Sequence, residues 1–236
     1  MIDTHGSGAP AAHDDHHHPR LQHHFDSLEQ QKESSTLGMW LFLVTEIMFF
    51  GGLFTVYVIY RYAYPKVFAA SSHHLDVLWG GINTAVLICS SLTMALSIYA
   101  AQINKRKLIV VFLIATILLG ATFLGIKTVE YMDKIKHHLV PGFGLHFAPD
   151  DPHLQGANGQ HAQLFFSLYF IMTGLHALHM IIGIGVLSVL AVLAWKGRYD
   201  SSYYNPLECT GLYWHFVDIV WIFLFPLLYL LGAHAR

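Results

Sequence analysis

Residues 41–50 read Leu41-Phe42-Leu43-Val44-Thr45-Glu46-Ile47-Met48-Phe49-Phe50, an apolar run interrupted by one carboxylate. The run continues in both directions, so that the apolar segment covers about Leu37–Tyr62. This length is enough for a helix that crosses a bilayer, which needs roughly 20 residues. Because lipid offers the backbone no hydrogen-bond partner, a spanning segment of this continuity is expected to be helical.

Four more apolar runs follow, which predicts an all-α integral membrane bundle of five transmembrane helices in one domain, residues 37–236. Glycines within the runs suit close packing of helices in lipid. We find no internal repeat, so a transporter with inverted repeats is not favoured. The further predicted spans are Val77–Ile103, Leu108–Tyr131, Gln163–Trp195 and Thr210–Ala233.

The composition agrees with lipid as the solvent. Of the 236 residues only 12% are charged and 54% are hydrophobic, whereas a soluble domain carries about 25% charged residues. The net charge of −2 argues against a nucleic-acid partner. The two cysteines, Cys89 and Cys209, form no CxxC motif, so neither a disulfide framework nor a zinc site is expected.

The N-terminal segment, residues 1–36, has a different composition. It holds seven of the 18 histidines, together with Asp, Gly, Pro and Ser, and few large apolar residues. Such a segment cannot bury a core, which predicts a disordered cytoplasmic tail rich in histidine. Loose metal binding by this tail and a merely solvated arm both remain open.

The basic residues predict the orientation. Lys105, Arg106 and Lys107 cluster in the shortest connection, on the same side as the N-terminus. With the other flanking residues, six basic residues lie on that side and five on the opposite side. By the positive-inside rule the N-terminus is cytoplasmic and the C-terminus lies outside. The Pro- and Gly-rich connection at 132–162 is then an irregular outer loop.

Glu46 is the clearest polar candidate within a span. A charged group at the centre of a span costs about 2.5–3.5 kcal/mol on insertion scales, so such residues are functional candidates by default. No basic residue lies one helical turn away. Two interpretations of Glu46 are considered. In the first it is a proton-exchanging or helix-anchoring carboxylate near a proton-uptake route or a subunit contact. In the second it is a protonated side chain that only hydrogen-bonds a neighbouring helix.

Lys127 and Glu130 are three residues apart near the end of the third span, so they share a helix face and can pair. Their position close to the membrane interface favours a snorkelling pair. The alternative is a polar anchor for a lipid head group or a partner subunit.

Two further polar pairs, His176 with His179 and His215 with Asp218, each have i, i+3 spacing in the last two spans. The two histidines at i, i+4 with a Glu between them that zinc peptidases use are absent. Haem could take axial histidines from facing helices. The alternative, which we favour, is a hydrogen-bond network between helices in which Asp218 fixes the tautomer of His215. We interpret the neighbouring aromatic residues as interfacial and packing groups: Tyr213, Trp214, Trp221 and Tyr229.

At this point the sequence resembles subunit III of the haem–copper oxidases, of the cytochrome c oxidase type. The resemblance covers about Leu37 to Gly232, and its most specific motif is Tyr213-Trp214-His215-Phe216-Val217-Asp218-Ile219-Val220-Trp221. It also rests on Gly174-Leu175-His176-Ala177-Leu178-His179, Lys127-Thr128-Val129-Glu130-Tyr131, Gly38-Met39-Trp40 and Asn83-Thr84.

The resemblance implies a non-redox accessory subunit in a bacterial inner membrane, with its N-terminus inside. The haems and copper belong to partner subunits I and II, and this chain is expected to hold no metal or other cofactor of its own. Subunits of this family pack against subunit I, bind phospholipid in a cleft, and sustain proton uptake and stability during turnover. The resemblance makes the three histidines of the spans structural, and it places the carboxylate that matches Glu46 near the contact with subunit I.

Fuller family members have seven spans, and this chain lacks the first two. It therefore resembles shorter bacterial forms, in which an extended subunit I supplies equivalent helices. A quinol oxidase subunit III and a related nitric oxide reductase subunit are alternatives, although Glu46 and Lys127–Tyr131 resemble the cytochrome c branch more closely. An independent haem-b membrane protein and a proton-coupled transporter built on Glu46 are rivals of another class. A larger respiratory supercomplex is a further candidate partner.

Overall fold

The computed structural model describes residues 25–72, 75–136, 159–199 and 203–230. Within these ranges the chain is all-α, and five of its helices are long and apolar enough to cross a membrane. The predicted bundle of five transmembrane helices is therefore confirmed. The five helices are α1 (Leu28–Ala63), α3 (Val77–Gln102), α4 (Arg106–Lys136), α5 (Gly159–Trp195) and α6 (Asn205–Phe225). The short α2 (Pro65–Ser72) follows α1, and the π-helix η2 (Pro226–Leu230) continues α6.

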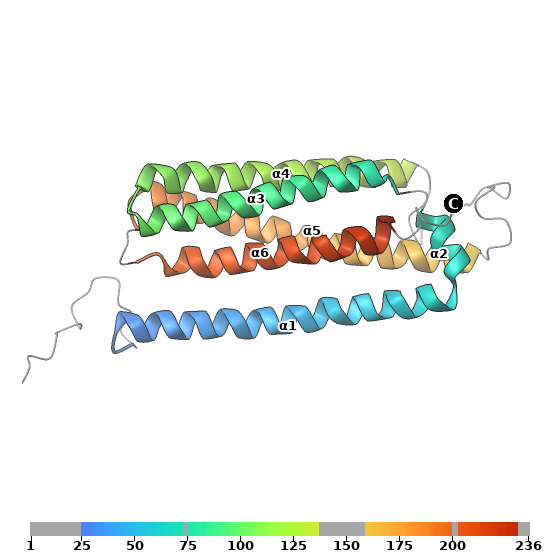
Figure 1. Cartoon of the computed structure of the whole chain (residues 1–236), viewed down its shortest axis with the longest axis horizontal. Coiled ribbons are helices and arrows are strands. Elements are labelled where there is room, and N and C mark those ends of the chain that lie inside the picture. Colours follow the sequence, from blue (N-terminus) through green and yellow to red (C-terminus); the bar gives the residue numbers. More distant parts are fainter. Residues whose placement is uncertain (1–24, 73–74, 137–158, 200–202, 231–236) are drawn as a thin grey trace, which may run out of the picture.

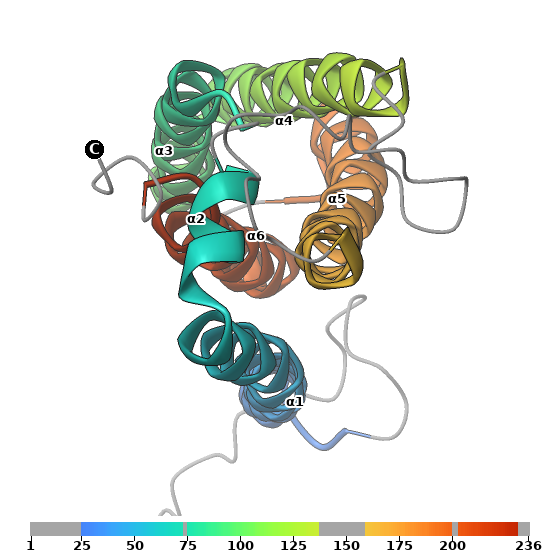
Figure 2. The ribbon, with the colours of Figure 1, turned by 90° about the vertical axis from the view of Figure 1, so that its right-hand side faces the viewer.

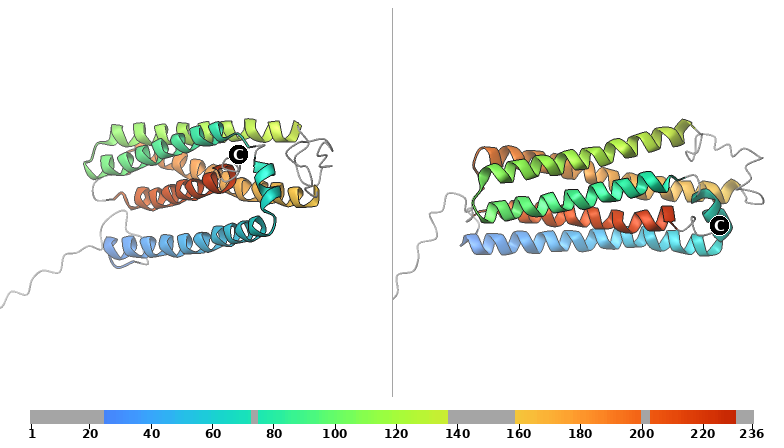
Figure 3. Two further views of the ribbon diagram at one scale, coloured as in Figure 1. Left: turned by 45° about the vertical axis from the view of Figure 1, so that its right-hand side comes forward. Right: turned by 45° about the horizontal axis from the view of Figure 1, so that its top comes forward.

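The long helices run side by side along the length of the molecule (Figure 1). Viewed along the bundle, α3, α4, α5 and α6 form a ring in which each helix packs against the next, and α6 also contacts α3 (Figure 2). Helix α1 lies outside this ring against α6 and α5, and α2 crosses the end of the bundle (Figure 3). Within α1 only a stripe at heptad spacing is buried, namely Leu43, Phe50 and Tyr57.

Helix α1 begins at Leu28, nine residues before the predicted boundary at Leu37. Ser27 caps the helix by accepting a hydrogen bond from the Gln30 backbone N–H (3.1 Å), and the Gln30 side chain accepts one from the Asp26 N–H (2.8 Å). The arrangement is related to a capping box, but the Gln30 side chain accepts from the residue before the N-cap and not from Ser27 itself. Residues 28–36 are thus helical and do not belong to a disordered tail. The histidines up to residue 24 lie outside the described residues.

The other boundaries agree with the predicted spans to within a few residues at most ends. Helix α4 continues to Lys136 and α5 starts at Gly159, so both extend into the predicted outer loop. The remainder of that loop, 137–158, lies outside the described residues. Helix α2, which begins at Pro65, was not predicted because eight residues are too few to form a hydropathy signal.

Pro226 ends the regular α6 helix and begins the π-helical turn. Proline has no N–H to donate, so the hydrogen-bond pattern changes at this residue. A nearby backbone carbonyl, that of Leu227, accepts a hydrogen bond from the hydroxyl of Tyr57 on α1 (2.8 Å). The turn also carries the buried Tyr229 to Lys127 and Glu130 of α4.

The fully buried Trp214 of α6 organises the centre of the ring. Its indole N–H donates to Ser90 Oγ on α3 (3.0 Å). A Cβ atom added at Gly120 of α4 or at Gly183 of α5 would lie 2.9 Å from the Trp214 ring. These two glycines therefore provide the space that a large indole needs between two helices in lipid.

Candidate functional site

Glu46 lies opposite His179, which comes from a different helix. The distance from Glu46 Oε2 to His179 Nε2 is 3.2 Å, and the two side chains are 19% and 13% exposed. This is an ion-pair distance, although Oε2 makes no hydrogen bond of good geometry within the described residues. Residue 46 falls between the buried positions 43 and 50 of α1, so the carboxylate faces the bundle. The contact joins the outer helix α1 to α5.

The surroundings of His179 determine where its protons lie. His179 Nδ1 is 2.8 Å from the carbonyl oxygen of Leu175. Because a carbonyl oxygen only accepts hydrogen bonds, Nδ1 must carry a hydrogen. In the neutral ring, Nε2 would then present a bare lone pair to the Glu46 carboxylate. A hydrogen bond between the two side chains therefore requires a hydrogen on Nε2 or on the carboxyl group.

Aromatic rings shield this pair. The ring of Phe50 stands edge-on to the His179 ring, with 5.5 Å between centroids. The Tyr213 ring lies 6.4 Å from the same ring, and its hydroxyl donates to the His179 carbonyl oxygen (2.9 Å). The His179 side chain is therefore held by its Nδ1 contact with Leu175 and by two neighbouring aromatic rings, with Nε2 directed at Glu46 on α1.

A second polar cluster, the Lys127 cluster, lies inside the ring of helices. Lys127 Nζ is 2.8 Å from Glu130 Oε2 and donates to the hydroxyl of Tyr229 (2.6 Å). The hydroxyls of Tyr169 and Tyr229 donate to Glu130 Oε1 at 2.8 and 2.5 Å. Lys127 also lies over the Trp221 ring, 4.6 Å from its centroid. One cation and one anion are thus satisfied by groups from three elements.

This cluster corrects the snorkelling interpretation. The Lys127 and Glu130 side chains are only 5% and 8% exposed, so the ammonium group points into the bundle and not towards a head-group region. The reason is that Tyr169 and Tyr229 supply the hydroxyl groups which water would otherwise provide. Tyr229 is accordingly a buried hydrogen-bond partner and not an interfacial aromatic residue.

His215 and Asp218 lie on the side of α6 that faces α3. His215 Nδ1 is 2.7 Å from Ser91 Oγ, which is therefore the observed partner of this nitrogen. Neither carboxylate oxygen of Asp218 makes a hydrogen bond of good geometry within the described residues. All three residues line a groove of about 420 Å³ between α3 and α6. The predicted contact in which Asp218 orients His215 is not among those observed.

His176 packs within the aromatic core. It is 1% exposed, and its ring centroid lies 5.4 Å from that of Phe123 and 5.2 Å from that of Trp221. The three histidines of the spans therefore face different surroundings: aromatic rings for His176, Glu46 for His179 and Ser91 for His215. Among the described residues, no three His, Cys, Asp or Glu side chains converge as a metal site would require.

The sequence pattern located these charged residues but missed their partners. Glu46 and His179 come together, as do Lys127 and Glu130, whereas His215 and Asp218 lie apart from both pairs. The missed partners are hydroxyl-bearing: Ser91, Tyr169 and Tyr229. Hydroxyl groups are common in membrane helices, where many bond only to their own backbone, so their positions alone carry little signal.

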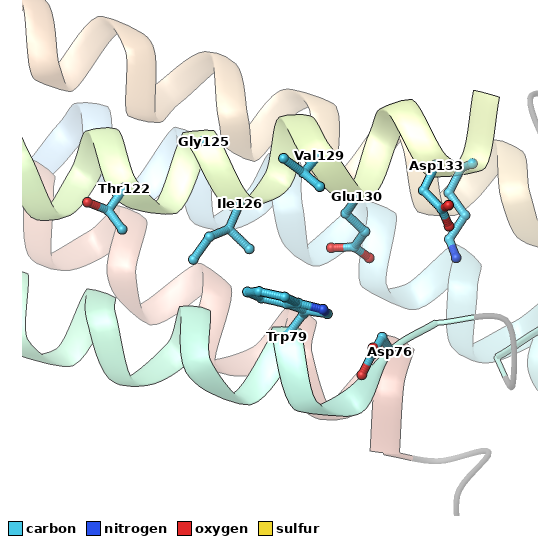
Figure 4. A pocket seen from close by; sticks show the side chains of 9 residues that line it. Asp76, Trp79, Thr122, Gly125, Ile126, Val129, Glu130 and Asp133 are labelled. Carbon is cyan, nitrogen blue, oxygen red and sulfur yellow. The ribbon is translucent and has the colours of Figure 1, made fainter. Parts of the chain in front are cut away.

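Two larger grooves also open on the outside of the described part of the bundle. One of about 500 Å³ lies between α1 and α6 and is apolar apart from His215. The other, of about 620 Å³, lies between the start of α3 and the end of α4. It combines apolar walls with charged residues at one end (Figure 4).

Comparison with known proteins agrees with this architecture. Residues 158–233 match the family described as Cytochrome c oxidase subunit III. A cytochrome c oxidase subunit 3 from Synechocystis is 34% identical over 93% of this chain and 80% of the relative. A probable quinol oxidase subunit 3 from Staphylococcus haemolyticus is 29% identical over 88% and 94%. The cytochrome bo(3) ubiquinol oxidase subunit 3 of Pseudomonas aeruginosa is 28% identical over 89% and 91%.

The fold and these relatives define a multi-pass membrane subunit of a terminal oxidase. The chain belongs to the subunit III family of the haem–copper oxidases.

Proposed function

We propose that the chain is a non-redox accessory subunit of a proton-pumping terminal oxidase, in which it packs against subunit I, binds phospholipid, and sustains proton uptake and stability during turnover. The observation that carries the proposal is the Glu46–His179 contact, which joins α1 to α5 inside the spans (3.2 Å). Ionisable residues inside membrane spans are costly, and where they pair with one another they commonly mark proton relays or other functional sites.

Packing against a larger partner is supported by the surface of α1. This helix buries only three residues against the rest of the chain, although it is 36 residues long. Trp40 and Ile47 line the apolar groove between α1 and α6, and both are more than half exposed. In the membrane this groove is covered by partner helices or lipid. We propose subunit I, with subunit II in the same complex and a larger respiratory assembly as a further partner.

The absence of a redox role is supported by the packing of the histidines. A bis-histidine haem needs two imidazoles directed at one space, and His176 and His215 are engaged with different neighbours. We therefore assign the haems and copper of the complex to the partner subunits.

The bacterial inner membrane, with the N-terminus in the cytoplasm, fits the distribution of basic residues. The start of α1, the α3–α4 turn and the end of α5 lie at one end of the bundle (Figure 1). Arg106 follows the α3–α4 turn and donates to the Ala194 carbonyl oxygen at the end of α5 (3.1 Å). A basic cluster at a short connection favours the cytoplasmic side.

The second candidate function is that of a quinol oxidase subunit, which differs from the first in the electron donor of the complex. Relatives described as cytochrome c oxidase subunits and as quinol oxidase subunits both align over most of the chain. We propose the cytochrome c type and retain the quinol type as the alternative, because the shared chain length and helices are compatible with both.

The proposal predicts that Glu46 prolongs the period over which the oxidase complex stays active during turnover. Oxidase that contains Glu46→Gln is expected to retain its initial rate of oxygen reduction and to complete several-fold fewer turnovers before it loses activity. The measurement follows oxygen consumption by the purified complex until activity ceases. The matched control is Glu33→Gln, an exposed carboxylate on the same helix.

An unchanged number of turnovers in Glu46→Gln would contradict the proposed role of this residue. Complete loss of electron transfer in an intact complex would also contradict it, because a non-redox subunit cannot stop electron flow directly.

A further inference from the structure

A groove on the outer surface of the bundle lies between α3 and α6 and combines three polar residues with apolar walls. Its volume is about 420 Å³, which lies within the range of about 300–1,000 Å³ that is usual for small-molecule sites. The polar residues are Ser91 of α3 with His215 and Asp218 of α6. The apolar walls are formed by Leu87, Ile88, Leu92, Ala95, Ile219 and Ile222. We call this the α3–α6 groove.

The α3–α6 groove is open to the hydrocarbon of the membrane. On its walls, Ile88, Leu92 and Ile219 are each half or more exposed. Both helices are long and apolar enough to span a membrane. A small molecule that occupies the groove therefore reaches it through the lipid phase.

Two polar side chains of the groove have unused hydrogen-bonding atoms. Asp218 is 2% exposed, and neither of its carboxylate oxygens makes a hydrogen bond of good geometry within the described residues. His215 uses Nδ1 for its contact with Ser91 Oγ (2.7 Å), which is its only hydrogen bond in the described part of the chain. A buried polar group without a partner costs about 1–3 kcal/mol. Because acyl chains carry neither donors nor acceptors, an occupant with a polar atom is favoured over hydrocarbon alone.

These polar residues lie near the middle of the membrane. Ser91 is 14 residues after Val77 and 11 residues before Gln102, so it lies within two residues of the midpoint of α3. His215 is at the same depth because its ring contacts Ser91. The surface of the hydrocarbon core is about 15 Å away in either direction. A phospholipid head group lies at that surface, so it cannot supply the missing hydrogen bonds.

His215 is the polar group that meets a ligand in the groove. It is half-buried, and it borders both the α3–α6 groove and the groove between α1 and α6. A neutral imidazole has one N–H and one bare nitrogen, and the Ser91 hydroxyl can pair with either of them. When Ser91 donates to Nδ1, Nε2 carries the hydrogen and donates to a carbonyl oxygen. When Nδ1 donates to Ser91, Nε2 accepts from a hydroxyl group.

We propose that the α3–α6 groove binds a membrane quinone or its quinol, with one ring oxygen at Nε2 of His215. Such a ligand dissolves at the bilayer midplane, has a flat apolar body, and carries a carbonyl oxygen in one form and a hydroxyl group in the other. Its ring lies against Leu92 and Ile219, Asp218 forms the floor beneath it, and its tail continues into the lipid. The proposal concerns binding alone and goes beyond the proposed function, since it applies to a complex with either electron donor.

The form of the groove favours this ligand over a partner helix. Packed helices meet along ridges and grooves that extend over several turns. The unused polar atoms lie instead within one turn of α6, at His215 and Asp218, in a recess between two helices. A ring inserted into the recess reaches them, whereas a helix that rests on the exposed Ile88, Leu92 and Ile219 remains outside.

Photolabelling of the purified oxidase complex tests the proposal. The probe is an azido-quinone with a prenyl tail, and labelled peptides of this chain are located by mass spectrometry. We expect label on α3 and α6 around Leu92 and Ile219, and a several-fold loss of that label in the presence of excess unlabelled ubiquinone or menaquinone. Because the label is mapped on this chain, a quinol site in a partner subunit does not affect the result.

Two variants and one control locate the site. Leu92→Trp fills the groove from a position that is 61% exposed, so the core is unchanged. His215→Phe keeps an aromatic ring and removes both nitrogens. The matched control is Leu118→Trp, since Leu118 on α4 is 62% exposed and does not line the groove. We expect several-fold less label in Leu92→Trp and in His215→Phe than in the wild type and in Leu118→Trp.

Three outcomes would overturn the inference. The first is equal labelling of Leu92→Trp and Leu118→Trp. The second is label that excess quinone does not suppress, which indicates partition into the lipid-facing surface. The third is an unlabelled groove in which a benzophenone side chain introduced at Ile88 crosslinks to a partner subunit, because a partner helix is then the occupant. All three leave the proposed non-redox role intact, since none of them concerns a haem or copper in this chain.

Discussion

Replacing Lys127 with methionine is expected to lower the free energy of unfolding by about 3–5 kcal/mol, the usual effect of removing one partner from a buried ion pair. Glu130 would keep its two tyrosine donors but lose the cation 2.8 Å from its other oxygen. The cation–π contact with Trp221 (4.6 Å) would also be lost. Methionine preserves the length of the side chain, so the effect reports the charge. Denaturant unfolding of the full chain in detergent measures it.

The control for this experiment is Lys107→Met, because Lys107 is an exposed lysine at the start of the same helix. We expect this substitution to change stability by less than about 0.5 kcal/mol. The double variant Lys127→Met with Glu130→Gln should recover much of the loss, since no buried charge remains unpaired. A loss in Lys127→Met no larger than in the control would contradict the buried pair.

The Glu46–His179 pair is expected to contain one proton at neutral pH. Either the infrared spectrum shows a protonated carboxyl C=O stretch that disappears in Glu46→Gln, or nitrogen NMR of labelled histidine shows a doubly protonated His179 ring. This follows because Nδ1 donates to the Leu175 carbonyl oxygen and Nε2 faces Oε2 at 3.2 Å. In His179→Leu the carboxyl stretch should be present, because no partner remains close to Oε2.

The substitution His179→Leu should also weaken the packing of α1 against α5 by about 1–2 kcal/mol, as expected for the loss of a polar contact between membrane helices. Ser188→Leu is a suitable control, since Ser188 is exposed on α5 and its hydroxyl bonds only within its own helix (2.7 Å). An ionised Glu46 beside a neutral His179 ring in the wild type would contradict the shared proton.

The five spans could be predicted because membrane helices satisfy their backbone internally and leave a long apolar run as their signal. Glu46 and the Lys127–Glu130 pair could be identified as candidates because charged residues are rare within such apolar runs. The start of α1 was missed because its signal lies in the side chains of Ser27 and Gln30 and not in hydropathy.

The partners of the charged residues could not be predicted. Tyr229 and Tyr169 reach Glu130 from positions 99 and 39 residues away in the chain, and Ser91 reaches His215 over 124 residues. Such pairings depend on how the helices are arranged around the ring and on the π-helical turn after Pro226. The arrangement around the ring leaves no local pattern in the sequence, and Pro226 marks where α6 ends without indicating which side chains the following turn brings to α4.

The most direct test of a non-redox subunit of a terminal oxidase is the visible spectrum and subunit content of the protein purified by a tag on this chain. We predict that a haem-bearing subunit and a copper-bearing subunit co-purify with it, and that the chain separated from them shows no haem absorption. A stoichiometric haem band in the separated chain would contradict the account.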